Sequence, residues 1–389
     1  NVYPAVETSS AVTFVTNSVI GNMNNPFIWN AKDLLEQTIN LNRGWNWTSI
    51  YVEPENNAVA EVLAPIASVI EIAKDKSTYT MYGNNAWRGD LAEINVGAMY
   101  KMQMRNPATL SVVGEKVNPS AKSIKVKSGW NWIGYTPSFN LSVADAFADL
   151  NPQDGDVVKS KNDFAIYNSY EWVGTLTALA PGSGYMYYSN ANAEKEFTYP
   201  SQPSAQPSQM RRVQHRANEF TVDDNSQYYG NMTIVAIVKN GNIVEPSVEV
   251  GVFVGTECRG ANVSETDGLV FLTIAGEGYG DILTFKVKVG AQIYQVEKTI
   301  VFEDDATLGT LNEPFVIQIG EETAIENTTI TSANVYTRDG QLVVEGTDAD
   351  YVVYDAVGRI IYTGSAPSIS LPRGVYMVHL GGEIQKVVL

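Results

Sequence analysis

Hydrophobic and polar residues alternate along much of the chain, and the alternation is clearest over residues 219–320. Turn residues such as Asn240-Gly241-Asn242 separate the alternating runs. Short strands at regular spacing, with such turns between them, are typical of an antiparallel β-sandwich. We expect its strands at Met232–Val238, Val248–Val254, Leu269–Ile274, Ile282–Val289 and Ile293–Phe302.

The last segment, residues 323–389, repeats this pattern on a smaller scale. Its Asp339-Gly340 pair favours a tight β-hairpin turn. The segment is therefore predicted to form a second, small β-sandwich. Its expected strands are Gln341–Glu345, Tyr351–Tyr354, Ile360–Tyr362, Val375–Leu380 and Ile384–Leu389.

Two stretches before residue 200 are copies of one another. Gly44-Trp45-Asn46-Trp47 recurs as Gly129-Trp130-Asn131-Trp132, 85 positions later. The same offset places residues 87–91 on residues 172–176, which share a Trp-x-Gly-x-Leu pattern, and Tyr100 on Tyr185. Separated matches at one fixed offset indicate a tandem duplication.

Each copy is expected to be a small, mainly β unit with one short helix. The Trp-Asn-Trp segment is predicted to be a strand with both indoles on one face. Because a unit of about 80 residues has a modest core, we expect the two copies to pack against each other. Apolar residues at helical spacing follow the strand in each copy: Ala58, Val59, Val62, Leu63 and Ile66, and then Val143, Ala144, Phe147 and Leu150.

A second, weaker repeat links the N-terminus to the sandwich. Residues 12–28 match residues 300–316, including Phe14, Gly21, Asn24, Pro26 and Phe27 of the first stretch. The later stretch closes a complete β domain, so we interpret residues 1–37 as the tail of a truncated earlier copy plus a connector. The alternative is that the fragment is native and donates strands to a neighbouring domain or chain.

The predicted chain is thus mainly β and multi-domain, with tandem duplicated β-rich units followed by an antiparallel β-sandwich and a small C-terminal β-sandwich. Three prolines among Ser and Gln at residues 200–208 predict a semi-rigid extended linker. The expected boundaries are 1–37 for the truncated tail, 38–122 and 123–199 for the two copies, 200–218 for the linker, 219–322 for the sandwich and 323–389 for the C-terminal sandwich.

Charge and composition exclude several classes of function. Lys and Arg number 26 against 43 acidic residues, which gives a net charge of −17. Nucleic acid and anionic lipid are bound through clustered cations, so we expect no nucleic-acid partner. No apolar run approaches the ~20 residues that cross a bilayer, so we expect no membrane insertion either.

The sequence offers no set of catalytic residues. His215 and His379 lie far apart and in no metal-ligand spacing, and no nucleophile motif, carboxylate pair or phosphate loop can be placed. Cys258, beside Arg259, is expected to be a small buried hydrophobe rather than an activated thiol. We therefore predict a non-catalytic protein, and assign no catalytic or metal-binding residues.

Five stretches of the last segment together resemble the C-terminal sorting domain of the type IX secretion pathway of Bacteroidetes: Val335-Tyr336, Leu342–Gly346, Val353–Arg359, Leu371–Tyr376 and Lys386–Val388. The Gly-Trp-Asn-Trp repeats are similar to modules of Bacteroidetes surface proteins described as adhesins. Gly255–Gly260, with the closure at Asn312–Phe315, resembles a sandwich module of the same proteins. These resemblances imply a protein that is secreted or held at the outer-membrane surface and acts in cell adhesion. In that family a working sorting signal is removed on secretion.

Aromatic residues are the first candidates for ligand contact, because exposed rings stack on sugars. Six of the seven tryptophans occupy equivalent positions of the duplication, the exception being Trp29. Equivalent placement is what a core position requires, so we expect buried indoles rather than glycan contacts. The exposed ligand-binding candidates are instead tyrosines: Tyr167, Tyr170, Tyr187, Tyr188, Tyr228 and Tyr229.

Three charged features carry weaker hypotheses. Arg88, Gly89 and Asp90 form the tripeptide that integrins bind, but that role needs a protruding loop tip and the repeat pattern already explains the glycine. Acidic residues at 154–156, 303–305 and 348–350 offer oxygen ligands for calcium, which is the one cofactor left open, although such acidic turns are usually solvated. The basic run Arg211-Arg212 with His215-Arg216 is expected to be solvated linker charge, or else a protease-sensitive or anion-binding site.

The sequence favours a non-catalytic extracellular or cell-surface adhesin or scaffold, with several weak sites acting together. The expected partner is a surface protein or glycan of a host or neighbouring cell. The alternative is a carbohydrate-binding accessory region of a larger surface enzyme. A passive stalk without a ligand is a third possibility.

Overall fold

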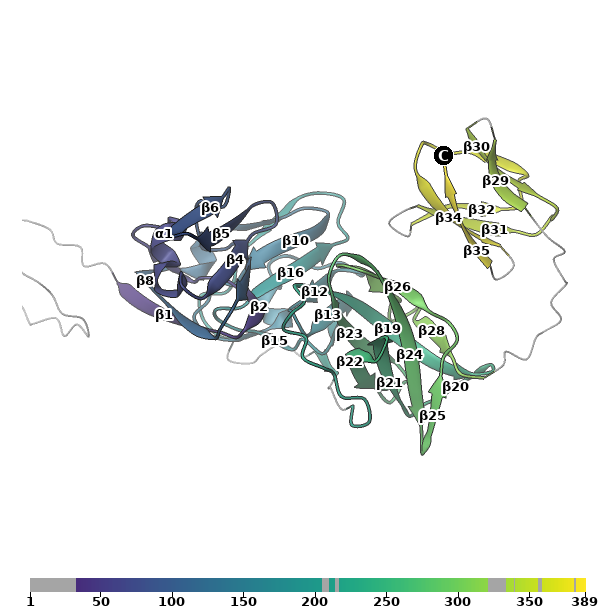
Figure 1. Ribbon diagram of the computed structural model, residues 1–389, viewed down its shortest axis with the longest axis horizontal. Helices are drawn as coiled ribbons and strands as arrows, with labels where there is room; N and C mark the ends of the chain where they lie inside the picture. The colour runs from purple at the N-terminus through teal and green to yellow at the C-terminus, as the bar shows by residue number, and fades with distance from the viewer. Residues whose placement is uncertain are drawn as a thin grey trace, which may run out of the picture. The chain divides into compact units, whose positions relative to one another are not determined.

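The computed structural model describes residues 33–204, 210–213, 217–320, 334–338, 340–355, 359–380 and 383–389. Over these residues the chain is built almost entirely from β-strands, with two one-turn α-helices and two short 3-10 helices (Figure 1). It divides into two compact units between residues 321 and 322. The predicted mainly β, multi-domain fold is confirmed. The proposed truncated copy lies almost wholly outside the described residues.

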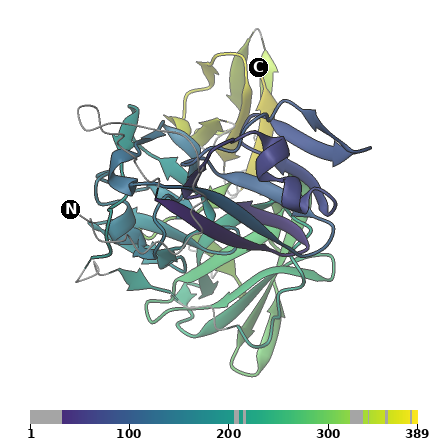
Figure 2. The same ribbon diagram turned by 90° about the vertical axis from the view of Figure 1, so that its left-hand side faces the viewer.

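The first copy folds around two sheets, with strand orders β1-β8-β3 and β2-β7-β4-β5-β6 (Figures 1 and 2). Side chains such as Leu63, Ile70 and Ile94 are fully buried in one core. The elements are β1 (Leu34–Leu41), β2 (Gly44–Thr48), β3 (Val52–Pro54), α1 (Val59–Val62), η1 (Ala64–Ile66), β4 (Ile70–Lys74), β5 (Tyr79–Gly83), β6 (Ala86–Gly89), β7 (Tyr100–Met104) and β8 (Ala108–Lys116).

The second copy has the equivalent main sheet, β10-β16-β12-β13-β14, and its own core around Phe147, Leu179 and Tyr199. The short helix α2 begins where Ser142 accepts a hydrogen bond from the backbone N–H of Asp145, as helix caps do. The elements are η2 (Pro119–Ala121), β9 (Ile124–Val126), β10 (Gly129–Gly134), β11 (Leu141–Ser142), α2 (Val143–Ala146), β12 (Val157–Lys159), β13 (Phe164–Asn168), β14 (Glu171–Gly174), β15 (Ala178–Leu179), β16 (Gly184–Ser189) and β17 (Lys195–Phe197).

Equivalent residues of the two copies make the same local contacts. The Asn46 side chain exchanges hydrogen bonds with the backbone of Asn42, at 2.9 and 2.8 Å. Its counterpart Asn131 does the same with Lys127, at 2.9 and 2.7 Å. The asparagine between the two tryptophans is therefore a turn-fixing residue in both copies, because a side chain that bonds the backbone four residues earlier holds the entry to the strand.

The two copies pack on each other through a reciprocal pair of lysine contacts. Lys76 donates to the carbonyl of Trp130 at 2.7 Å, and its counterpart Lys161 donates to the carbonyl of Trp45 at 2.7 Å. Each lysine therefore contacts the Trp-Asn-Trp strand of the other copy, at the first tryptophan of that strand. Such reciprocity is the signature of two-fold, isologous packing.

The backbone repeats the same two-fold relation. The N–H of Ser49 donates to the carbonyl of Gly182 at 3.1 Å, and the N–H of Gly134 donates to the carbonyl of Gly97 at 2.9 Å. These residues are again equivalent in pairs at the repeat offset. The expected packing of the copies against each other is confirmed.

The basic run after the linker belongs to the second copy. β18 (Arg211–Arg212) pairs in parallel with β14, and Arg211 forms an ion pair with Asp267. We predicted solvated linker charge here; instead, the pairing extends the main sheet because β14 offers its open edge. His215 and Arg216 lie outside the described residues.

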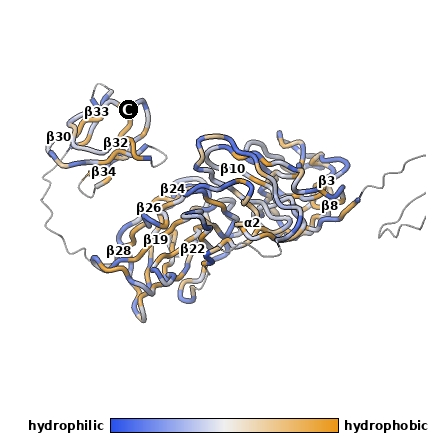
Figure 3. Tube along the Cα trace, turned by 180° about the vertical axis from the view of Figure 1, so that it is seen from behind, coloured by the Kyte–Doolittle hydropathy of each residue, from blue (hydrophilic) through white to orange (hydrophobic). Residues whose placement is uncertain are grey.

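The predicted sandwich consists of two sheets that enclose an apolar core. One has the order β20-β19-β23, with β27 and β28 paired in parallel to β19, and the other has the order β22-β21-β24-β25, with β26 paired to β24. The long hydrophobic run of β19 is visible in Figure 3. The strands are β19 (Gly230–Asn240), β20 (Ile243–Val244), β21 (Val248–Val254), β22 (Glu257–Val263), β23 (Val270–Gly276), β24 (Tyr279–Val289), β25 (Gln292–Gln295), β26 (Ile300–Glu303), β27 (Thr307–Leu308) and β28 (Phe315–Gln318).

An apolar cluster joins the sandwich to the second copy. Phe164 of β13 packs on Phe271 of β23, with ring centroids 5.9 Å apart, and both side chains are fully buried. Val213 and Val235 belong to the same cluster. The two copies and the sandwich therefore share buried surface, which places them in one compact unit.

The C-terminal unit is a small two-sheet module with its own core around Leu342, Val353 and Val378. Arg338 pairs with Gln341 across the predicted hairpin turn. The sheets have the orders β29-β30-β33 and β32-β31-β34-β35. The strands are β29 (Asn334–Arg338), β30 (Gln341–Glu345), β31 (Tyr351–Asp355), β32 (Ile360–Gly364), β33 (Ser368–Ser370), β34 (Val375–Leu380) and β35 (Glu383–Val388).

Alanine substitutions at the equivalent glycines Gly44 and Gly129 test how the segment leading into the sandwich docks on the first copy. Both have φ near +80°, so alanine at either position costs about 1–2 kcal/mol of stability. A Cβ on Gly44 would also meet the backbone of Ser226, whereas a Cβ on Gly129 would meet nothing within 4 Å. We expect Gly44→Ala to lower the free energy of unfolding clearly more than Gly129→Ala, as measured by urea denaturation. Equal losses would contradict this docked arrangement.

Candidate functional site

The four indoles of the Trp-Asn-Trp strands lie between modules rather than in the core of either copy. Trp45 and Trp47 are buried, and Trp130 and Trp132 are half-buried. The Trp47 indole N–H donates to the carbonyl of Tyr229 at 2.8 Å, and so ties the first copy to the sandwich. We expected these indoles to be buried in the core of each copy. They lie instead where the two copies meet the sandwich, and we call this region around Trp45, Trp47, Trp130 and Trp132 the junction.

The other two repeated tryptophans differ in burial. Trp172 is fully buried in the core of the second copy, where its ring packs on Phe147. Its counterpart Trp87 is only half-buried and packs on Tyr82. Trp29 lies outside the described residues.

Lys101 is the most unusual residue of the junction. Its side chain is fully buried, and its Nζ lies 4.4 Å from the ring centroid of Trp47, 4.6 Å from that of Trp132 and 5.2 Å from that of Tyr229. Nζ has no hydrogen-bond partner among the described residues. The ammonium group is therefore held by ring faces, and such cation–π contacts strengthen when water is excluded.

Lys159 is a second fully buried lysine, at the end of β12. Its Nζ lies 4.4 Å from the ring centroid of Trp130 and donates to the carbonyl of Asn231 at 3.1 Å and to Oδ1 of Asp305 at 2.8 Å. The counterpart in the first copy, Lys74, lies 5.1 Å from the ring centroid of Tyr229 and is half-buried. The two copies thus use the same lysine position differently.

Burial shifts the proton affinities of these groups. Loss of hydration lowers the pKa of Lys101 from its ordinary 10.5 to about 8, and also lowers the pKa of Lys159, against the attraction of the nearby aspartates. Burial and the adjacent charge of Asp305 raise the pKa of Asp304 to about 6. The junction is therefore a charged cluster whose members are partly deprived of water.

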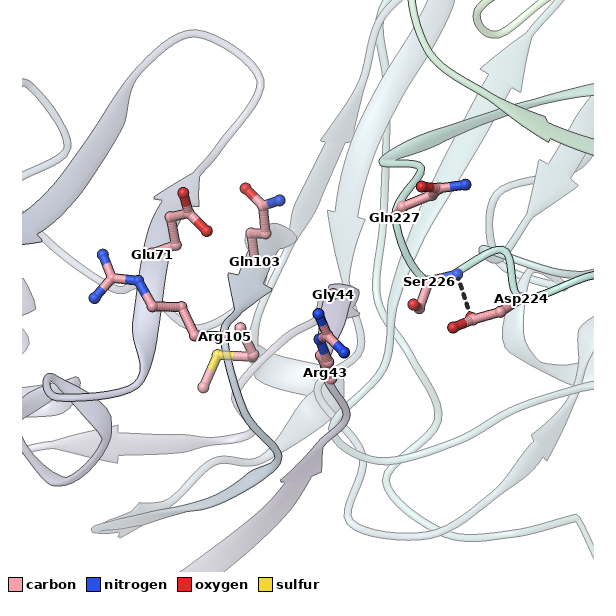
Figure 4. Close-up of a pocket in the computed structure, with 9 residues that line it drawn as sticks. Arg43, Gly44, Glu71, Gln103, Arg105, Asp224, Ser226 and Gln227 are labelled. Atoms are coloured by element: carbon pink, nitrogen blue, oxygen red, sulfur yellow. Dashed lines mark hydrogen bonds between the residues drawn. The ribbon is translucent and has the colours of Figure 1, made fainter.

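A polar cleft of about 480 Å³ opens beside the junction. It lies where the first copy docks on the segment leading into β19, and there the N–H of Trp45 donates to the carbonyl of Ser226 at 2.7 Å. The first copy contributes Arg43, Glu71, Gln103 and Arg105, and the segment leading into β19 contributes Asp224, Ser226 and Gln227 (Figure 4).

The cleft presents hydrogen-bonding groups rather than apolar surface. Asp224 accepts the N–H of Ser226 at 2.8 Å, a contact that lowers the pKa of its carboxyl. Arg43 and Arg105 are exposed and have no ion pair among the described residues. Guanidinium groups of this kind suit carboxylate, phosphate or polar oxygen ligands, because they donate two parallel hydrogen bonds.

Of the six candidate tyrosines, Tyr170 is the one the structure leaves fully open, at 94% exposure in the turn between β13 and β14. Tyr187 is wholly buried and donates to Asp156 at 2.7 Å, contrary to the expectation that it is exposed. Adjacent strand residues face opposite ways, so its neighbour Tyr188 packs on Trp130 instead. The remaining three are half-buried against other groups: Tyr167 on Trp172, Tyr228 beneath Arg259 and Tyr229 on Trp45.

The integrin-like tripeptide lies at a strand rather than at a loop tip. Arg88 and Gly89 belong to β6 and pair with Met81 and Thr80 of β5, and Asp90 follows directly. All three tripeptide residues are exposed. The hairpin tip is formed by Asn84 and Asn85, so the geometry that integrin binding requires is missing at residues 88–90.

Two of the three acidic stretches supply groups that contact the interior, whereas Asp348 and Asp350 of the third are exposed. Asp156 is buried and accepts the Tyr187 hydroxyl and the N–H of Asn190 at 2.7 Å each. Asp304 and Asp305 face the junction lysines. In the described part of the chain, no group of three or more His, Cys, Asp or Glu side chains is placed to hold a metal ion. Cys258 is buried, and burial raises the pKa of its thiol to about 11.

The buried lysines of the junction are residues that sequence reasoning did not single out. A signal existed: Lys74-x-Lys76 recurs as Lys159-x-Lys161 at the same offset as the tryptophans. A lysine repeated at the last position of an apolar strand is unusual, because lysine is rarely buried without a partner.

Comparison with known proteins adds little. No family model matches the chain, and no curated protein matches it. Similar solved structures include HBP35 of Porphyromonas gingivalis (16% identity, 43% of this chain and 65% of that one, TM-score 0.14) and the Bacillus anthracis TIE protein (10%, 92% and 72%, 0.15). A third is the BSP domain of a biofilm associated protein (12%, 92% and 63%, 0.14). The chain thus spans 65% of the length of HBP35. Similarity this low identifies neither a shared fold nor a shared function.

No helix in the described ranges is both long and apolar enough to cross a membrane.

Replacing Lys101 by Met, the residue at the equivalent position of the second copy (Met186), is expected to remove a pH dependence of stability. The folded-state pKa of about 8 lies below the ordinary 10.5, so the unfolded chain binds more protons between these values. The cost of burying Lys101 is therefore fully present below pH 8 and falls as the pH rises toward 10.5.

The wild-type protein should gain up to about 3 kcal/mol of unfolding free energy relative to Lys101→Met between about pH 7 and about pH 10, measured by urea denaturation. Lys127→Met, at a lysine whose side chain is 75% exposed, is the control and should show no such change. A stability difference between the wild type and Lys101→Met that stays constant with pH would contradict a titrating, buried Lys101.

Proposed function

We propose that the protein is a non-catalytic adhesin or scaffold outside the cell, and that it binds a surface protein or glycan of a host or neighbouring cell. The cleft beside the junction is the observation that carries this proposal. It is built jointly by the first copy and the sandwich segment, and it is lined by two exposed guanidinium groups that form no ion pair within the described ranges. A volume of about 480 Å³ is within the size range of ligand sites.

The same cleft favours a glycan as one form of the ligand. Sugars are recognised through many hydroxyl groups, and Gln103, Gln227 and Ser226 add amide and hydroxyl groups to the two arginines. This supports the second candidate, a carbohydrate-binding accessory region of a larger surface enzyme. An acidic loop of a partner protein would use the same arginines, as the adhesin proposal requires.

The proposed location rests on resemblance. The C-terminal unit is a separate β module, as a sorting domain of the type IX pathway would be. We propose that it directs the protein to the outer-membrane surface or to the medium. Expression in a type IX-competent Bacteroidetes cell, with and without residues 323–389, would test this: loss of surface or medium protein on truncation supports it, and unchanged export overturns it.

The cleft is tested by giving the first copy the residues of the second. The double variant Arg43→Ser with Arg105→Asn installs the residues at equivalent positions, Ser128 and Asn190. A hydrogen bond to a charged group contributes about 1.5–3 kcal/mol, so binding to cells or to a glycan array should fall about tenfold or more.

Lys125→Ser with Lys127→Ser is the matched control for this experiment. It removes the same two positive charges, from side chains that are 65% and 75% exposed, and should bind like the wild type. Array binding lost only in the arginine variant favours the glycan ligand. Cell or protein binding without a sugar response favours the adhesin. Wild-type protein that binds neither overturns the proposal.

Tyr170 tests whether the β13–β14 hairpin also contacts the ligand. Tyr170→Asn installs the residue found at the equivalent turn position, Asn85, and both positions have positive φ (71° and 59°). Asn adopts this conformation readily, so the free energy of unfolding should be unchanged or higher by up to about 1 kcal/mol. Weaker binding by this stable variant would support a ligand contact at Tyr170, and unchanged binding would rule it out.

A further inference from the structure

The contact between Lys159 and Asp305 differs from the surface ion pairs of the chain. The Lys159 side chain is completely buried, whereas the Lys288 side chain, which pairs with Glu219 at a similar distance, is 30% exposed. The Lys159 Nζ lies 2.8 Å from Oδ1 of Asp305 and against the face of Trp130. The pair joins the last residue of β12 in the second copy to the turn between β26 and β27 in the sandwich.

One carbonyl group holds both partners in place. The carbonyl of Asn231 accepts a hydrogen bond from the Lys159 Nζ at 3.1 Å and another from the backbone N–H of Asp305 at 3.0 Å. Asp305 also has a left-handed backbone, with φ +67°. The amine and the carboxyl group are thus fixed at contact distance, and holding two reacting groups in this way replaces an encounter in solution.

The surroundings suit a condensation of the two groups. A lysine becomes a nucleophile when it is neutral, and desolvation favours the neutral amine. Burial lowers the pKa of Lys159 and raises that of the neighbouring Asp304, whose Oδ1 is buried without a hydrogen-bond partner among the described residues. The charge of Asp304 acts on the Lys159 ammonium group, so the Asp304 carboxyl lies near the reacting pair. We assign it the role of general acid and base.

We propose that Lys159 and Asp305 form an intramolecular amide bond that covalently joins the second copy to the sandwich. The Lys159 ammonium group first transfers a proton to the Asp305 carboxylate oxygen that it contacts at 2.8 Å, and the neutral Nζ then attacks Cγ of Asp305. A bond between Nζ and Cγ forms, and the bond between Cγ and the hydroxyl oxygen breaks. Asp304 takes a proton from the nitrogen and passes it to the departing hydroxyl, so that one water leaves and Asp304 ends unchanged. No oxidant or cofactor is needed.

The other junction lysines lack one part of this arrangement. Lys101 is buried, but its Nζ has no hydrogen-bond partner among the described residues. Lys74 is half-buried and faces the rings of Trp132 and Tyr229. The side chain of Asp305 is 26% exposed, which gives the released water a way out. The predicted bond is therefore specific to the Lys159–Asp305 pair.

Mass spectrometry of the purified, denatured chain tests the proposal. We expect an intact mass lower than that of the sequence by one water molecule, and a protease digest in which the peptides containing Lys159 and Asp305 are joined. Lys159→Met and Asp305→Ala should each restore the full mass, whereas Lys101→Met, which removes the other buried lysine of the junction, should keep the loss of water. Wild-type protein at full mass, with the two residues in separate peptides, would overturn the proposal.

Asp304→Asn tests the proton carrier separately. This variant should leave a larger fraction of freshly synthesised chains at full mass at any given time after synthesis, because the general acid and base is gone. Wild-type kinetics of water loss in this variant would overturn the role of Asp304 while leaving the Lys159–Asp305 bond established by the intact mass.

Discussion

Removing a lysine ammonium group from water costs free energy unless other groups replace the lost hydration. At the junction, the replacements are ring faces of tryptophan and tyrosine, and a carbonyl and a carboxylate beside Lys159. These groups come from different modules, so an isolated copy would not supply all of the groups that surround Lys101 or Lys159. The arrangement of the two copies and the sandwich depends on this shared solvation, and the polar cleft exists as a result of it.

Duplication supplied the parts of the junction, and divergence gave them separate roles. The lysine of β4 and its counterpart in β12 began as one position, but Lys159 reaches Asp305 while Lys74 lies over rings. Lys101 lies among the aromatic rings of the junction. Its counterpart in the second copy is Met186, a flexible apolar residue that packs with Trp47. The sandwich docks on the two-fold pair of copies from one side, and an asymmetric neighbour requires different residues at equivalent positions.

Patterns with a local cause could be predicted from the sequence. Period-two alternation gave most strands of the sandwich, and the repeat offset gave the matching of the copies, because both follow from how side chains alternate along a strand. Contacts between modules could not be predicted in this way. Alternation places Tyr187 and Tyr188 on opposite faces, but does not say which face meets the core of the copy and which meets Trp130. The parallel pairing of β27 and β28 with β19, and of β18 with β14, likewise joins segments far apart in sequence, where local propensity carries no information.

The reciprocal contacts of Lys76 with Trp130 and of Lys161 with Trp45 have a consequence for how such a protein grows. In two-fold packing, each copy contacts the other through the same face, so a pair of copies leaves no such face exposed. Head-to-tail packing, in contrast, always leaves one interface free at each end. A third copy added to this chain would find no vacant surface of this kind and would need a fourth to pair with. Lengthening by duplication would therefore proceed two copies at a time, and the pair is the unit that evolution can multiply.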